Sequence, residues 1–132
     1  MERSRYARWF QQRLDKICPQ ADLSHISHLP RETGLALLQE ILKTGCLSGN
    51  AANILLARQA TAGLPADWLQ EALPLAVSCL FQEPEWREWE FRRLAEMTQG
   101  PFPACFAWLT DYVERFQDPE IQEAIEGYIG RL

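Results

Sequence analysis

Cys18, His25 and His28 have the residue types and spacing that come closest to a reactive centre. A thiol and two imidazoles in a C-x6-H-x2-H pattern are ligands that zinc prefers. A zinc site requires a fourth ligand and usually more closely spaced pairs, which this stretch lacks. We therefore predict no bound metal and no cofactor, and we place both histidines in the loop before Pro30.

Other catalytic patterns are also missing from the sequence. It contains no Gly-rich phosphate loop, no nucleophile elbow and no HExxH motif. Carboxylate pairs such as Glu83 and Glu85 lack an apolar pocket that would raise a pKa for general acid catalysis. We expect a protein that is not an enzyme and has no catalytic residues.

The size and composition indicate one domain over residues 1–132. A chain of 132 residues can bury about two-thirds of its unfolded surface. No apolar stretch approaches the roughly 18 residues of a membrane span, and no signal peptide is evident, so we expect a cytoplasmic location. The cysteines have no CxxC pair, which predicts buried, reduced thiols at Cys18, Cys46, Cys79 and Cys105.

Charge is distributed unevenly along the chain, whose net charge is −5. Residues 1–18 are basic, whereas residues 82–132 carry eleven Asp and Glu against five Arg. An acid-rich surface disfavours a polyphosphate backbone and attracts a basic partner. We therefore expect a protein partner, and neither nucleic acid nor a membrane.

Prolines and glycines divide the chain into helical segments, with Pro at the starts and Gly at the ends. No segment alternates as a strand would, so the predicted fold is all-α, with short loops between antiparallel neighbours. The two parts of the domain are N-terminal helices in 1–63 and helix pairs in 64–132. The expected helices cover about 3–18, 30–44, 49–62, 65–81, 83–97, 103–117 and 119–131.

Three positions carry specific expectations within these helices. Gly45 is predicted to cap the C-terminus of the second helix. Pro74 is predicted to kink or split the fourth helix. The segment after Pro74 is apolar on all sides, from Leu75 to Phe81, and is predicted to be the most buried helix of the fold.

Two segments of the C-terminal half match each other at a spacing of 35 residues: QEPEWREWEFRRL (82–94) and QDPEIQEAIEGYI (117–129). The stretch 118–132 resembles the second helix of a HEAT-type repeat, with Gln122 in place of the family's Arg. The matching residues are Asp118, Pro119, Ile121, Ala124, Ile129, Gly130 and Leu132. The resemblance covers about residues 64–132 and implies an α-solenoid of stacked helix pairs, with a compact helical bundle as the alternative. It also implies that Asp118 and Pro119 open a helix and that Arg87 braces a neighbouring turn.

The run EPEWREWEFRRLAEM (83–97) places two tryptophans among charges. A helical wheel gives it a wide apolar arc formed by Trp86, Trp89, Phe91, Leu94, Met97 and Thr98. Trp86 aligns with Ile121 and is predicted to lie in the core. Trp89 aligns with a small residue of the repeat, so it is either exposed or fills a larger core pocket. Glu90 and Arg93 fall inside the arc, where a charge is costly unless it is paired.

The leading hypothesis is a non-catalytic protein–protein interaction module that binds a basic protein through an acidic and aromatic surface. Its composition is similar to that of immunity proteins that neutralise bacterial toxins. The expected anchors are Trp89, Glu90 and Arg93, with an acidic rim of Glu85, Glu88 and Asp111. Two alternatives stay open. One is a small-ligand-binding or enzymatic domain with a pocket near Arg93, Glu90 and His28, and the other is a subunit that self-associates, for example as a homodimer, through Trp89.

Overall fold

The computed structural model describes residues 2–47, 50–80, 88–98 and 101–114, together with Pro119 and Glu123. Side chains are described for 5–47, 50–80, 90–98 and 101–112 within those segments. All elements among these residues are helical, and none of them is a strand, as the sequence predicts. The elements are α1 (Glu2–Asp15), the 3₁₀ helix η1 (Leu23–His28), α2 (Arg31–Leu47), α3 (Ala51–Ala62), α4 (Ala66–Leu80), α5 (Glu88–Thr98) and α6 (Pro103–Glu114).

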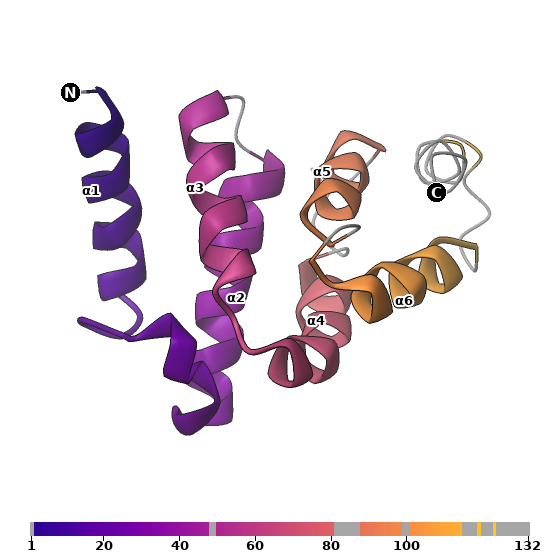
Figure 1. Ribbon diagram of the computed structural model, residues 1–132, viewed down its shortest axis with the longest axis horizontal. Coiled ribbons are helices and arrows are strands. Elements are labelled where there is room, and N and C mark those ends of the chain that lie inside the picture. The colour runs from indigo at the N-terminus through magenta and orange to yellow at the C-terminus, as the bar shows by residue number, and fades with distance from the viewer. Residues whose placement is uncertain are drawn as a thin grey trace.

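Helix α2 occupies the centre of the arrangement. It packs against α1, η1, α3, α4 and α5, and α6 packs on α4 and α5. Figure 1 shows α1 at one edge of the molecule, α3 in front of α2, and α6 lying across the opposite side. The fold is therefore a compact set of helices around α2, with α1 and α3 each presenting one side to solvent.

The core follows the apolar faces that the sequence indicates. In α1, Phe10 and Leu14 are buried and Tyr6 is half-buried, as is Ile17 in the turn after the helix. The central helix contributes one fully buried face, and α5 contributes a second. The side chains with no exposed surface include Leu37, Leu38, Ile41, Leu42, Phe91 and Leu94. Burial of this many large side chains stabilises the fold by about 1.5–3 kcal/mol for each one.

Gly45 does not cap α2, contrary to the prediction. The helix continues to Leu47, and Gly45 lies buried inside it. A Cβ atom at this position would lie 2.9 Å from the Sδ of Met97 and 3.0 Å from the Cβ of Ala57. The glycine is therefore needed because α3 and α5 approach α2 closely at this position, and it does not end the helix.

Pro74 does not split α4, which runs without interruption from Ala66 to Leu80. The second half of α4 is also less buried than predicted. Ala76, Val77 and Leu80 are buried, but Leu75 is 42% exposed, and Cys79 is exposed. The segment is apolar on all sides in sequence, yet only one side faces α2 and α6.

Capping residues set several helix boundaries close to their predicted places. The Asn50 side chain accepts hydrogen bonds from the backbone N–H groups of Ala52 and Asn53, which fixes the start of α3. Gly63 follows the last residue of α3, and Pro103 is the first residue of α6. The 3₁₀ helix η1 was not predicted. The seventh predicted helix, 119–131, lies outside the described residues apart from Pro119, which is helical and exposed, and Glu123.

Only two of the four cysteines are buried, although the sequence predicts burial for all four. The buried two are Cys46 and Cys105, whereas Cys18 is half-buried and Cys79 is exposed. Burial raises the pKa of both buried thiols, that of Cys105 to about 11. Among the helices of the described segments, none is both long and apolar enough to cross a membrane.

Candidate functional site

Helix α5 buries four of the six residues of the predicted apolar arc, and the other two, Trp86 and Trp89, have no described side chain. Phe91, Leu94, Met97 and Thr98 are all buried, and the Thr98 hydroxyl donates to the backbone carbonyl of Leu94 at 3.0 Å. The helix begins at Glu88, so the predicted start near 83 falls outside the described residues. The arc therefore faces α2, α3 and α6, and its edges carry the charged residues.

Glu90 and Arg93 are both half-buried at the edge of this arc. Arg93 pairs with Glu96 one turn further along α5, with 3.9 Å between Nη1 and Oε2. Glu96 also forms an ion pair with Arg58 of α3. One carboxylate thus lies between two guanidinium groups and joins α3 to α5, which satisfies charges that would be costly if buried alone.

A groove opens beside this ion-pair cluster. Its volume is about 520 Å³, and it is lined by Ala51, Ile54, Leu55, Arg58, Arg93 and Glu96. The apolar residues of the lining come from α3, and its charges are those of Arg58 on α3 and of Arg93 and Glu96 on α5. Leu55 is 43% exposed, which makes it one of the few large apolar side chains on the described surface. A groove with apolar residues and convergent charges can hold a segment of another molecule.

A second, smaller groove lies on the other side of Leu55. It has a volume of about 160 Å³ between α1 and α3, with a lining of Ala7, Ala52, Leu55, Leu56 and Gln59. The outward side of α3 is therefore an apolar ridge between two grooves. Only Arg58 among its described residues is charged.

Cys46 lies close to the charged cluster but does not act as a nucleophile there. Burial raises the pKa of its thiol, and the negative charges of Glu90 and Glu96 raise it further, whereas Arg93 lowers it. The thiolate is the reactive form of cysteine. A buried thiol that stays protonated at neutral pH has a packing role.

The structure brings only part of the predicted anchor set together. Glu90 and Arg93 lie near each other on α5, and Trp89 belongs to the same helix although its side chain lies outside the described part of the chain. Asp111 is exposed on α6. The remaining predicted residues are outside the described residues or, for Glu88, have no described side chain: Glu85, Trp86, Arg87, Glu88 and Asp118.

Arg58 and Glu96 are the site residues that sequence reasoning missed. Arg58 lies in an Ala-rich helix whose faces are poorly marked, so its contact with α5 has no local signal. Glu96 follows Arg93 by three residues, a spacing at which helical side chains meet. That spacing could have identified the pair, but not the second guanidinium from α3.

The pocket predicted near Arg93, Glu90 and His28 does not form. His28 ends η1, before the first turn of α2, whereas Glu90 and Arg93 lie near Cys46 in the last turn of α2. The 15 helical steps from Arg31 to Cys46 correspond to about 22 Å along the helix axis. His28 therefore cannot share a small-molecule site with the charges of α5.

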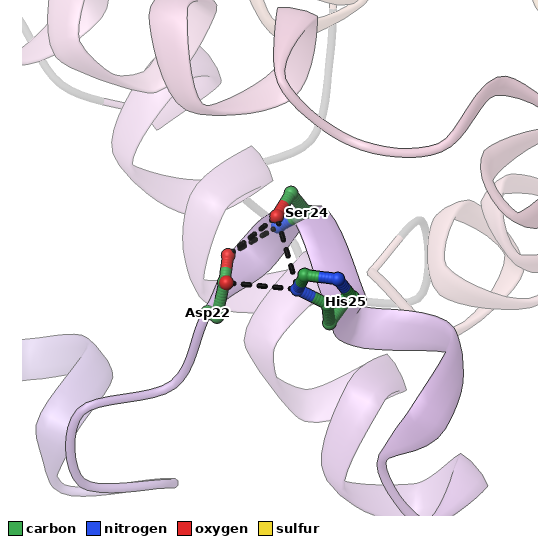
Figure 2. Close-up of polar contacts among 3 residues, drawn as sticks. All are labelled: Asp22, Ser24 and His25. Carbon is green, nitrogen blue, oxygen red and sulfur yellow. Dashed lines mark hydrogen bonds and ion pairs between the residues drawn. The ribbon is translucent and has the colours of Figure 1, made fainter.

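Asp22, Ser24 and His25 form a polar cluster at the start of η1 (Figure 2). The Asp22 carboxylate accepts from the Ser24 backbone N–H at 3.0 Å and from the Ser24 hydroxyl at 2.6 Å. His25 Nδ1 lies 2.8 Å from Asp22 Oδ2. The hydrogen bonds from Ser24 and then His25 lower the pKa of Asp22 to about 2.

This cluster contains Asp, Ser and His but lacks the geometry of a catalytic triad. In a triad, one imidazole nitrogen contacts the carboxylate and the other contacts the nucleophilic hydroxyl. Here the Ser24 hydroxyl, at 3.3 Å, and the Asp22 carboxylate contact the same Nδ1 atom of His25. The Ser24 hydroxyl already donates to Asp22, so the arrangement is a helix cap.

Metal binding has no candidate group in the described part of the chain. No set of three or more His, Cys, Asp or Glu side chains among those residues is close enough to hold an ion. The rings of His25 and His28 contact each other edge to face, with 5.7 Å between their centroids.

Comparisons with known proteins found no match: no family model, no curated protein and no solved structure is similar to this chain.

Proposed function

We propose that this protein is a non-catalytic protein–protein interaction module that binds its partner over the outward side of α3 and the groove between α3 and α5. The observation that carries the proposal is the groove of about 520 Å³, whose lining combines the exposed Leu55 with the Arg58–Glu96–Arg93 cluster. Interfaces with proteins combine an apolar centre with Arg side chains at its border.

The shape of the groove supports a protein partner over a small molecule. It is a shallow surface depression, and it continues over Leu55 into the groove between α1 and α3. Small-molecule sites bury most of the ligand surface in a concave, mostly apolar cavity. An elongated surface with one apolar ridge suits a helix or extended segment of another protein.

The ion-pair cluster supports specificity at this site. Arg58, Arg93 and Glu96 are each partly exposed, with side-chain fractions of 40%, 33% and 29%. Their charges are held in place by one another, so a partner meets a preformed arrangement and loses little side-chain entropy on binding.

The partner is proposed to be a basic protein, and the module an inhibitor or immunity-type protein that neutralises it. This finer proposal depends on the net charge of −5 and on the acid-rich stretch from residue 82 onward. In the described part of that stretch, Asp111 is exposed on α6, which packs against α5. Opposite net charges would accelerate the encounter, and Leu55 would be covered in the final complex.

A matched pair of leucine variants tests the site. Leu55 and Leu75 are 43% and 42% exposed, and they lie on different helices. We expect Leu55→Arg to weaken capture of the partner from an extract of the source cells by more than about tenfold, because a charge replaces the apolar centre of the interface. Leu75→Arg should leave capture unchanged.

Three measurements would contradict the proposal. If both variants lose capture, or if neither does, the partner does not bind specifically over the α3 surface. A small molecule retained by the purified protein in native mass spectrometry, with no protein captured, would favour the ligand-binding alternative. A dimer in light scattering that dissociates in Leu55→Arg would favour self-association.

A further inference from the structure

Helix α1 presents a basic face that the proposed function does not use. Six of the described side chains of α1 and the residue after it fall within an arc of about 140°, given 100° per residue: Arg5, Arg8, Trp9, Gln12, Arg13 and Lys16. All six are exposed, and the opposite side of α1 packs on α2 and α3. We call these six residues the α1 basic face. The six comprise four cations, one glutamine and one indole ring.

Three of the four cations have no internal charge partner. Arg13 forms an ion pair with Glu40 of α2. Arg5, Arg8 and Lys16 form no ion pair with another residue that the structure describes. These three side chains are thus free of the internal pairings that anchor Arg58 and Arg93, and their donors remain available to an external acceptor.

Trp9 gives the face an apolar centre. Trp9 is 39% exposed. The Cζ atom of Arg13 lies 5.2 Å from the centroid of the Trp9 ring. This cation–π contact, together with the ion pair to Glu40, restrains Arg13 and the indole beside it. An ordered Trp between cations is the composition of protein-binding hot spots.

We propose that the α1 basic face binds a short acidic segment of another protein, with carboxylates opposite Arg5, Arg8 and Lys16 and an apolar side chain against Trp9. Charge complementarity identifies the occupant, because four cations on one face attract negatively charged groups. The face is basic even though the net charge of the whole chain is −5. The cations extend from residue 5 to residue 16, which is 11 helical steps or about 16 Å. This length fits a few residues of a partner.

The same geometry disfavours a long polyanion. Carboxylates border the basic face: Asp15 is the last residue of α1, Glu40 of α2 pairs with Arg13, and Asp22 follows in the chain as the N-cap of η1. A nucleic acid strand carries charge along its whole length and would continue past the face toward these groups. A short acidic segment can end before them. This inference does not depend on the proposed function of the α3 surface.

The test uses the full-length protein and a fluorescent, glutamate-rich 16-residue peptide that contains one leucine. Binding is followed by anisotropy at low and high salt. We expect binding at low salt that is lost at about 0.5 M salt, where charges are screened within about 4–5 Å. Arg8→Glu should weaken it about fivefold, and the triple reversal Arg5→Glu/Arg8→Glu/Lys16→Glu by more than about fiftyfold.

Arg31→Glu is the matched control. Arg31 is exposed at the start of α2, where it lines a groove with Trp68 and Leu75 of α4, and its reversal changes the net charge as much as Arg8→Glu does. It should change affinity less than about twofold. Only exposed residues are changed, so we expect every variant to fold. Circular dichroism of each variant checks this.

Four outcomes would overturn the proposal: no peptide binding at low salt, equal losses in Arg8→Glu and Arg31→Glu, binding that survives the triple reversal, or an oligonucleotide or anionic vesicle that binds the face more tightly than the peptide. Light scattering adds a fifth. Association between copies of this chain that the triple reversal abolishes would identify a second copy as the occupant.

Discussion

Substituting Gly45 by alanine should destabilise the protein, although alanine is the better helix former. Removing a glycine from a helix interior gains about 1 kcal/mol. The new Cβ would lie 2.9 Å from the Sδ of Met97 and 3.0 Å from the Cβ of Ala57. The methionine can rotate away, but the Ala57 Cβ is fixed to the backbone of α3, so the helices must separate. Overpacking of this kind costs about 1–3 kcal/mol. We expect a net loss of up to about 2 kcal/mol, or up to about 6 °C in melting temperature.

Gly63→Ala is the control for this experiment. Gly63 also has a right-handed helical conformation, with φ −85°, and an added Cβ would meet nothing closer than the Ala60 carbonyl at 3.6 Å. We expect its free energy of unfolding to rise by about 0.5 kcal/mol, because the unfolded chain loses freedom. Urea unfolding of both variants gives the comparison. If Gly45→Ala proves as stable as Gly63→Ala, the inference that α2, α3 and α5 pack too closely at Gly45 to admit a Cβ atom is wrong.

The remaining predictions concern thiols, a carboxylate and a helix cap. At pH 7, a maleimide should label Cys79 within minutes and reach Cys46 and Cys105 only after unfolding, which mass spectrometry can follow; rapid labelling of the native protein at either buried position would contradict the packing. Since the pKa of Asp22 is lowered from 3.8 to about 2 in the fold, its ionised form should stabilise the protein above pH 4 and lose this effect as the pH falls to 2. The stability difference between wild type and Asp22→Asn should therefore shrink over that range in urea titrations, and a constant difference would exclude the carboxylate. Asn50→Ala should cost about 1 kcal/mol by removing the α3 cap, and Asn50→Ser should restore most of it.

Local signals in the sequence predict the helices well and their surroundings less well. Prolines, glycines and apolar spacing mark most boundaries in the described chain, because capping and helix entry depend on neighbouring residues. Gly45 shows the limit: a glycine near a helix end has the same local signature whether it caps the helix or admits a neighbour. Leu75 and Cys79 show another, since an all-apolar segment does not indicate which side the rest of the chain will cover.

The candidate site was predicted only in part for the same reason. Glu90 and Arg93 stood out as charges inside an apolar arc, and the structure places both half-buried at its edge. Their companion Arg58 comes from a helix 35 residues earlier in the chain. Neither spacing nor composition connects two such positions; only the packing of α3 and α5 on α2 does.

The central position of α2 has a consequence for how this protein can change over generations. The surrounding helices contact α2 on their inner sides; of the exposed faces of α1 and α3, Arg13 also pairs with Glu40 of α2 and Arg58 with Glu96 of α5. Substitutions at the other exposed positions of α1 and α3 can therefore accumulate independently of each other and of the core. Selection can alter one of these surfaces while it preserves the fold and the other surface.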